Sequence, residues 1–192
     1  MKVFFDTEFT GLHQETTLIS IGCVAENGDT FYATLSDYDP AQVDEFVRAH
    51  VLPHLLYSQD DKDVAVIDET DAKGRRHQRY YGLNRETCRD RLSAWLKPFR
   101  RVEMWSDCLA YDWVLFRNLF KEDGGLPVCV YYIPFDICTL FKIHGIDPDI
   151  DRKKFARTED IKHNALADAY MIKACYERVS EEYIDTIPKR RY

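Results

Sequence analysis

The chain has 192 residues, of which 45% are hydrophobic and 31% charged, and these proportions are ordinary for one globular domain. The formal net charge of −7 argues against a protein that coats nucleic acid through a broad basic face. No apolar run approaches the roughly 20 residues of a membrane-spanning helix, and acidic residues come too early for a secretory signal peptide. We therefore expect a cytoplasmic protein with no membrane association.

The first 35 residues are predicted to form three strands. Lys2–Phe5 is a short apolar run that ends at Asp6. Leu18–Glu26 and Thr30–Leu35 are rich in β-forming residues and flank Asn27-Gly28, a dipeptide typical of tight hairpin turns. These patterns predict an antiparallel three-stranded meander.

A helix is expected over Ala41–Val51, where apolar residues recur at helical spacing. The following segment, Tyr57–Asn84, begins with acidic residues and ends with a basic and aromatic run. We interpret it as a hairpin or loop insertion at about residues 57–84, with a β-hairpin turning near Lys73-Gly74. A solvated loop is the alternative interpretation of this segment.

Helices and strands alternate in the second half of the chain. The expected strands are Val102–Trp105 and Val128–Ile133, and Asp147–Glu159 is expected to be a polar loop. Apolar positions at helical spacing predict four helices, at Arg85–Phe99, Tyr111–Phe120, Phe135–Ile143 and Ala165–Glu182. The whole pattern predicts a single α/β domain over residues 1–192. Its five-stranded mixed sheet, an antiparallel meander followed by parallel strands, would be flanked by helices.

Asp6 and Glu8 stand two residues apart where the first strand ends. Because side chains alternate along a strand, both carboxylates point to the same face. Adjacent carboxylates repel each other unless a positive group lies between them, and hard oxygen ligands suit magnesium or manganese. A D-x-E pair alone is a weak signal, since a solvated strand end would look the same.

Two further acidic positions occur at helix starts. Asp112 follows Tyr111 where a strand turns into a helix, although an acidic residue in that place often serves only as a helix cap. Asn164 is a natural N-cap for the last helix, which places Asp168 one turn inside it and His163 just outside. A carboxylate among alanines at Asp168 is unusual unless it has a partner.

Taken in order, these elements resemble the DEDD exonuclease superfamily in its histidine variant (DEDDh). Asp6-Thr-Glu-Phe-Thr-Gly-Leu12 is close to that superfamily's D-x-E-T-T-G-L, and His163-Asn-Ala-Leu-Ala-Asp168 matches its H-x4-D. Proofreading exonucleases, oligoribonuclease and RNase T share these motifs. The opening and the compact size look most like a branch of small stand-alone exoribonucleases, and the resemblance extends to about Cys175.

The resemblance implies a ribonuclease-H-like fold and a 3′–5′ exonuclease that releases nucleoside 5′-monophosphates. It implies two divalent ions, Mg²⁺ or Mn²⁺, bound by Asp6, Glu8, Asp112 and Asp168. It also implies that His163 is the general base, a role that suits a side chain with an ordinary pKa of about 6.5. Substrate contacts are implied for Thr7, Phe9, Thr10, Leu12, Tyr111 and His163. For Leu12, ordinary core packing is an equal alternative.

Two departures from the family pattern concern substrate placement: Phe9 stands where threonine is usual, and Cys108 stands where asparagine is usual. The branch resemblance favours RNA, as a single strand or a 3′ overhang. The alternatives are a DNA proofreading-type exonuclease, a ribonuclease-H-type endonuclease, and a non-catalytic nucleic-acid-binding module on the same fold.

One basic and aromatic run interrupts the otherwise acidic chain. Arg75, Arg76, Arg79 and Tyr80 lie in it, and cations with aromatics are typical of nucleic-acid contacts. We interpret this run as an arm that grips the substrate strand or, less favoured, packs across a homodimer interface. Alternatively, the arginines pair with nearby acidic residues and have no such function.

Overall fold

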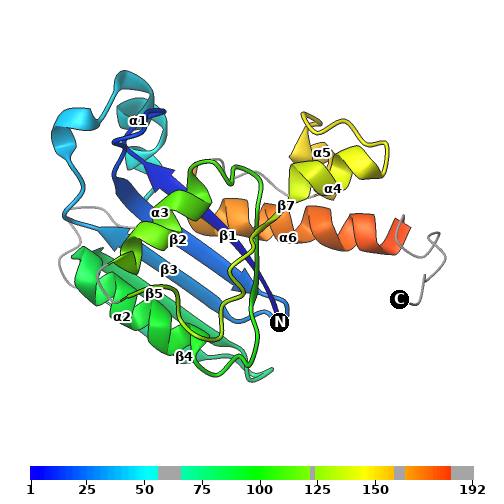
Figure 1. The fold of residues 1–192 in the computed structure, drawn as a ribbon, viewed down its shortest axis with the longest axis horizontal. Coiled ribbons are helices and arrows are strands. Elements are labelled where there is room, and N and C mark those ends of the chain that lie inside the picture. Colours follow the sequence, from blue (N-terminus) through cyan, green and yellow to red (C-terminus); the bar gives the residue numbers. More distant parts are fainter. Residues whose placement is uncertain (56–65, 122–123, 158–162, 183–192) are drawn as a thin grey trace.

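The computed structural model describes residues 1–55, 66–121, 124–157 and 163–182, which form a mixed sheet with helices on both faces (Figure 1). The sheet has the order β4-β5-β3-β2-β1-β6-β7. Its strands are β1 Lys2–Phe9, β2 Leu18–Ala25, β3 Thr30–Leu35, β4 Val66–Thr70, β5 Arg76–Leu83, β6 Glu103–Ser106 and β7 Phe135–Asp136. The helices are η1 Pro40–Gln42, α1 Glu45–His50, η2 Leu52–His54, α2 Arg85–Leu96, α3 Asp112–Leu119, α4 Ile137–Ile143, α5 Arg152–Ala156 and α6 Ala165–Glu182. The predicted α/β class is confirmed.

The predicted meander is present, because β2 pairs antiparallel with both β1 and β3. Gly28 turns the chain between β2 and β3 with a φ of 92°, a conformation that glycine adopts without strain. The first strand extends beyond its predicted end at Phe5, since Asp6 and Glu8 continue to pair with Gly22 and Ser20 of β2. The two carboxylates therefore lie on a rigid strand, not in a loop.

The sheet has seven strands where five were expected. The additional pair is the predicted hairpin, β4 and β5, whose turn includes Gly74 and whose second strand pairs in parallel with β3. The hairpin joins the sheet because Tyr80 of β5 is buried against Phe31 of β3. Residues 57–65 of the predicted insertion lie outside the described residues. The division into one domain with an insertion stays a prediction.

Three predicted elements differ from the structure. Val128–Ile133 makes only one β-bridge, between Val130 and Val102, and the seventh strand is the short β7 instead. Val128 is fully exposed there, so the apolar run does not supply a buried strand face. The predicted polar loop contains α5, which Asp151 caps. The helix expected over Ala41–Val51 is divided into η1 and α1, because Asp44 caps a new helix.

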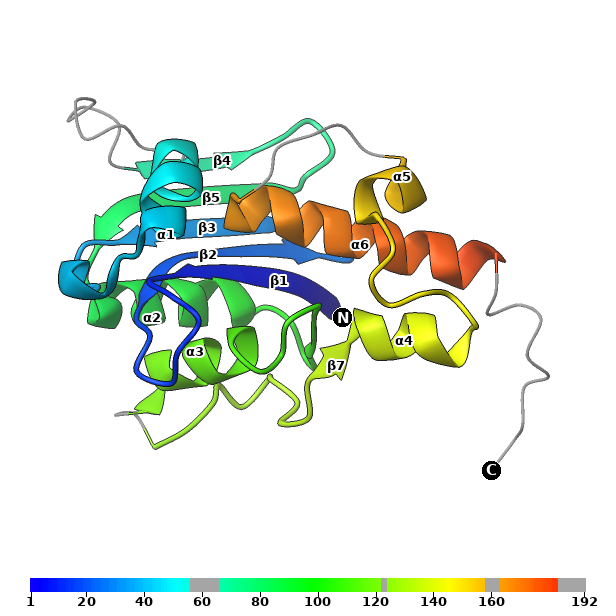
Figure 2. The same ribbon diagram turned by 90° about the horizontal axis from the view of Figure 1, so that it is seen from above.

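Helices α2 and α3 pack on one face of the sheet, whereas α6 crosses the other face with α4 and α5 beside it (Figure 2). The strand alternation of β1 determines which residues meet which helix. Val3 and Phe5 belong to the core cluster of α2 and α3, whereas Phe4 packs on Tyr176 of α6. Asp6 and Glu8 continue the alternation of Phe4, so they lie on the α6 face.

Gly22 lets α6 approach the sheet closely. A Cβ atom at this position would lie 2.3 Å from the backbone carbon of Ala165 and 2.3 Å from the nitrogen of Leu166. The first turn of α6 therefore rests directly on β2 at the position that pairs with Asp6. This contact brings the start of α6 to the carboxylates of β1.

Among the described residues, the longest helix is α6, with 18 residues. Neither α6 nor another described helix is long and apolar enough to cross a membrane. The expected cytoplasmic location and the homodimer stay predictions.

We predict that Gly22→Ala destabilises the protein, because the added methyl group overlaps backbone atoms of α6 that cannot move aside independently. Overpacking of this kind typically costs about 1–3 kcal/mol. The free energy of unfolding, measured by urea denaturation, should fall by about 2 kcal/mol or more. Ser20→Ala is the matched control on the same strand face, since the buried Ser20 hydroxyl makes no hydrogen bond in the described structure. Equal stability of Gly22→Ala and wild type would contradict the close contact.

Candidate active site

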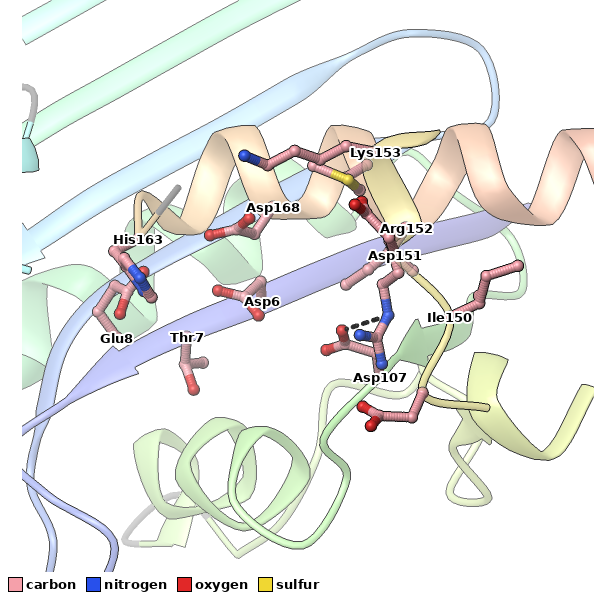
Figure 3. Close-up of a pocket in the computed structure, with 13 residues that line it drawn as sticks. Asp6, Thr7, Glu8, Asp107, Ile150, Asp151, Arg152, Lys153, His163 and Asp168 are labelled. Carbon is pink, nitrogen blue, oxygen red and sulfur yellow. Dashed lines mark ion pairs between the residues drawn. The ribbon is translucent and has the colours of Figure 1, made fainter. Parts of the chain in front are cut away.

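The side chains of Asp6 and Glu8 project from β1 toward the N-terminal end of α6 (Figure 3). Asp6 lies opposite Gly22, where the absent side chain leaves room for the helix. Asp168, one turn into α6, faces the two strand carboxylates across this gap. Asp6, Glu8 and Asp168 each offer one oxygen atom, and these atoms lie within 4.8 Å of one another.

Asn164 orients the first turn of α6. Its side-chain oxygen accepts a hydrogen bond from the backbone nitrogen of Ala167 at 3.2 Å, which confirms the predicted N-cap. Its side-chain nitrogen donates to the carbonyl oxygen of His54 at 2.9 Å, and its backbone nitrogen donates to Asp168 at 3.2 Å. The helix end is thereby anchored to η2, and the Asp168 carboxylate is held near the start of its own helix.

Asp112 enters the site from the opposite face of the sheet. It is the first residue of α3 and is 1% exposed. Its Oδ1 accepts hydrogen bonds from the backbone nitrogen of Thr7 at 3.2 Å and from the Thr7 hydroxyl at 2.6 Å, and its Oδ2 accepts one from the Ser106 hydroxyl. These bonds connect α3 to the ends of β1 and β6. Asp112 is therefore not only the residue that begins its own helix.

His163 immediately precedes the N-cap of α6 and lines the same pocket. Its φ of 59° lies in the left-handed region, which residues other than glycine rarely adopt and which occurs often at functional sites. Phe46 of α1 contacts the imidazole edge-on, with ring centroids 5.3 Å apart, and His50 lies 6.2 Å away by the same measure. Helix α1 therefore packs against His163.

The structure brings together the five predicted catalytic residues and adds a carboxylate that the sequence analysis missed, Asp107. Asp6, Asp107 and Asp112 form a second group whose oxygen atoms lie within 4.8 Å of one another. The pocket has a volume of about 520 Å³, and its lining includes Asp107 together with Arg152 and Lys153 of α5. Strand alternation places Asp107 on the same face as Trp105, but only the pairing of β6 with β1 puts it beside Asp6.

Burial and mutual repulsion raise the pKa values of these carboxyl groups. Burial raises the pKa of Glu8 to about 8, with additional repulsion from Asp168 and Asp112. Burial likewise raises the pKa of Asp112 to about 7, although hydrogen bonds from Ser106 and Thr7 oppose the shift, and that of Asp168 to about 6. The pKa of Asp6 lies well above its ordinary value, because the group is buried and surrounded by other carboxylates.

This donor set fits divalent cations. All ligand atoms of the two groups are carboxylate oxygens, the hard donors that Mg²⁺ and Mn²⁺ prefer. The raised pKa values indicate that the negative charges are poorly compensated by the surrounding protein. A bound cation would supply the missing compensation and keep these groups ionised.

The predicted substrate-binding residues have different environments. Thr7 lines the pocket, and the partly buried rings of Phe9 and Tyr111 stack on each other, with centroids 5.0 Å apart. Leu12 is 77% exposed, which excludes the alternative that it packs in the core. Thr10 is fully buried, and its hydroxyl donates to Gln42 at 2.9 Å. A substrate contact at Thr10 stays a prediction.

The predicted arm is corrected in part. Tyr80 is 2% exposed and cannot present its ring to a nucleic acid, because it faces the core under α2. Arg76 forms an ion pair with Asp29 at 2.7 Å, and Arg75 forms one with Asp71 inside the hairpin. Strand alternation sends neighbouring residues of β5 to opposite faces of the sheet, so the run does not form one basic surface. A substrate contact through Arg79 stays a prediction.

Comparison with known proteins identifies the class of protein. A family model described as "3′-5′ exoribonuclease Rv2179c-like domain" matches residues 1–180. The chain is 47% identical over 175 residues to 3′-5′ exoribonuclease Rv2179c of Mycobacterium tuberculosis (strain ATCC 25618 / H37Rv), covering 88% of this chain and 87% of that protein. The same values hold for 3′-5′ exoribonuclease MT2234.1 of strain CDC 1551 / Oshkosh.

A solved structure supports the fold. The catalytic unit of Neurospora crassa Pan2, which comprises a protease and a nuclease domain, superposes with a TM-score of 0.53 at 14% sequence identity. The match covers 96% of this chain and 27% of the Pan2 unit. The predicted ribonuclease-H-like fold and membership of the DEDD exonuclease superfamily are confirmed. Within that superfamily, the chain belongs to the Rv2179c-like 3′–5′ exoribonuclease domain family.

We predict that the metal-free protein loses stability as the pH rises from about 5.5 to 8. The folded pKa values of Asp168, Asp112 and Glu8, about 6, 7 and 8, exceed the values near 4 of an unfolded chain. The folded state therefore holds more protons, and the stability that this provides is complete below about pH 4 and lost as the pH rises through the folded values.

The measurement is the melting temperature in EDTA across this pH range. Mn²⁺ should restore stability at pH 8, because it compensates the ionised carboxylates. Glu8→Gln should flatten the upper part of the pH dependence, since the group that titrates there is gone. A melting temperature in EDTA that is constant or rises between these pH values would contradict the electrostatic description.

Proposed function

We propose that this protein removes nucleoside 5′-monophosphates one at a time from the 3′ end of single-stranded or 3′-overhang RNA. Two divalent ions, Mg²⁺ or Mn²⁺, would be held by Asp6, Glu8, Asp112 and Asp168, and His163 would be the general base. The observation that carries the proposal is the convergence of Asp6, Glu8, His163 and Asp168 on one pocket from β1 and the start of α6. Asp112 of α3 joins them through its grouping with Asp6. Membership of an exoribonuclease family supports RNA as the substrate.

The two carboxylate groups share Asp6, which supports a centre of two ions that Asp6 would help to hold. Divalent ions bound here would make the attacking water more acidic and stabilise negative charge on the leaving 3′ oxygen. Thr7 and Ser106 hold the Asp112 carboxylate in place, and the Asn164 backbone holds that of Asp168. Fixed ligands of this kind keep the geometry needed for in-line displacement without reorganisation during the reaction.

His163 suits the base role because it lies at the pocket but outside both carboxylate groups. Its imidazole would accept the proton of the attacking water and later release it to solvent. Phe46 contacts the imidazole from the side of α1, which limits the directions in which the ring can turn. Packing against Phe46 would thus direct the imidazole into the pocket. Because His163 belongs to neither carboxylate group, it could accept a proton without also binding a metal ion.

The stacked pair of Phe9 and Tyr111 and the exposed Leu12 would contact the terminal nucleotide. Stacking accepts every base, because each base has a π face, so we expect little sequence preference. Leu12 projects from the turn after β1 with most of its side chain in solvent, where it would wedge against the last base.

The test is incubation of 5′-labelled RNA and DNA oligonucleotides of the same sequence with Mg²⁺, with Mn²⁺ and with EDTA. We predict a single-nucleotide ladder on RNA that EDTA abolishes, and loss of nearly all turnover in Asp6→Ala and Asp168→Ala. Asp90→Ala, an exposed carboxylate of α2, is the control. Internal cuts would indicate an endonuclease, preferential DNA cleavage a proofreading-type enzyme, and no cleavage a binding module. Each of these outcomes, or full activity in Asp6→Ala, would refute the proposal.

We predict that His163→Ala lowers turnover by about 10²–10⁴-fold, the usual contribution of a positioned general base. Mn²⁺ binding, followed by calorimetry, should change little, because His163 belongs to neither carboxylate group. His144→Ala, at the end of α4, serves as the control for loss of a histidine. A loss of Mn²⁺ affinity in His163→Ala as large as in Asp168→Ala would identify His163 as a ligand, not a base.

A further inference from the structure

Asp107 is a fifth carboxylate of the pocket and has no role in the function proposed above. It directly follows β6, which pairs in parallel with β1 so that Trp105 lies beside Phe4. If this register is continued by two residues, Asp107 lies beside Asp6, and alternation turns both side chains to the α6 face. The grouping of Asp107 with Asp6 and Asp112 agrees with this geometry.

The ion pair of Asp107 with Arg152 is poorly aligned. The Nε atom of Arg152 lies 3.1 Å from Oδ2 of Asp107 (Figure 3), yet this buried N–H does not point along that line and makes no hydrogen bond in the described structure. The Nη2 atom instead contacts the sulfur of Cys138 at 3.1 Å. A carboxylate that accepts a bidentate, well-aligned guanidinium is strongly held, and Asp107 lacks that arrangement.

The pair of Asp107 with Arg152 leaves the charge balance of the pocket unchanged. Asp6, Glu8, Asp112 and Asp168 would neutralise two divalent ions, and the pair of Asp107 with Arg152 would add no net charge. Asp107 can therefore bind the cation while Arg152 stays nearby as its counter-ion. Without the cation, the guanidinium is a positive group beside Asp107 and favours the ionised form of that carboxyl.

We propose that Asp107 is a ligand of the second metal ion, together with Asp6 and Asp112, and that Arg152 holds Asp107 when this ion is absent. The proposal rests on the two-metal function and extends it to a carboxylate outside the four that the sequence motifs supply. It assigns Arg152 as a positioning residue whose guanidinium competes with the cation for the same carboxylate.

The test is calorimetric titration of the full chain with Mn²⁺, without substrate, in wild type and three variants. Asp107→Asn should weaken one of two Mn²⁺ sites by about 10–100-fold, the usual effect of disturbing a metal-site contact. Arg152→Gln should tighten the same site, because the competing cation is removed. Asp149→Asn removes an exposed carboxylate that lines the same pocket but belongs to neither ligand group, so it should leave both affinities unchanged.

The double variant Asp107→Asn/Arg152→Gln tests whether Arg152 acts on Mn²⁺ binding through Asp107 or only through its positive charge. If Arg152 acts through Asp107, its removal has no further effect once Asp107 is gone, and the double variant binds the second ion as weakly as Asp107→Asn does. The proposal would be overturned if the changes in Mn²⁺ affinity of the two single variants added up in the double variant. It would also be overturned if Asp149→Asn weakened Mn²⁺ binding as much as Asp107→Asn does. Melting temperatures in EDTA establish that each variant is folded.

The outcome in wild type distinguishes this inference from the function on which it rests. Binding of one Mn²⁺ ion or none by the wild-type chain would refute the two-metal function, and the inference with it. Binding of two ions by wild type and by Asp107→Asn, with equal affinities, would refute only the role of Asp107. Weakening of the second site by about 10–100-fold in Asp107→Asn, with the first site intact, is the result that we expect.

Discussion

The close contact of α6 with β2 at Gly22 is the constraint on which the site depends. Because Gly22 has no side chain, the backbone at Ala165 rests on the strand, and the first turn of α6 reaches the plane of the β1 carboxylates. A larger residue would lift the helix and with it Asp168. The anchor of Asn164 on the carbonyl of His54 fixes the same helix end from the other side. The spacing of the acidic groups is therefore a consequence of backbone packing.

This packing gathers charges that the protein by itself does not neutralise. Burial raises the pKa values of Asp6, Glu8, Asp112 and Asp168, and their mutual repulsion adds to the shift for Asp6 and Glu8. The hydrogen bonds that Asp112 accepts offset only part of this effect. Such a cluster of carboxylates is unfavourable without a cation and favourable with one, so it is preorganised for metal binding. Packing of the sheet and helices holds the carboxylates together when no cation is bound.

Residues that are neighbours in the sequence often have different surroundings in the fold. These surroundings decide which of them can contact a nucleic acid. Arg79 and Tyr80 are adjacent in β5, yet the tyrosine is in the core, because alternate residues of a strand point to opposite faces. Thr10 lies next to the exposed turn of Leu12 but is buried, and its hydroxyl is used within the loop. A run of suitable residue types therefore does not amount to a surface until the fold determines how its members are oriented.

The sequence alone was sufficient for features determined by local rules. Strand alternation placed Asp6 and Glu8 on one face, the Asn164 cap located the start of α6, and the family motifs supplied Asp112, His163 and Asp168. Asp107 could not be found in this way, because its neighbours in the pocket come from the parallel pairing of β1 with β6. Such pairing joins segments that are far apart in the chain, and neither segment encodes the register by itself. The tertiary structure decided which carboxylates meet, because their positions depend on how strands and helices pack.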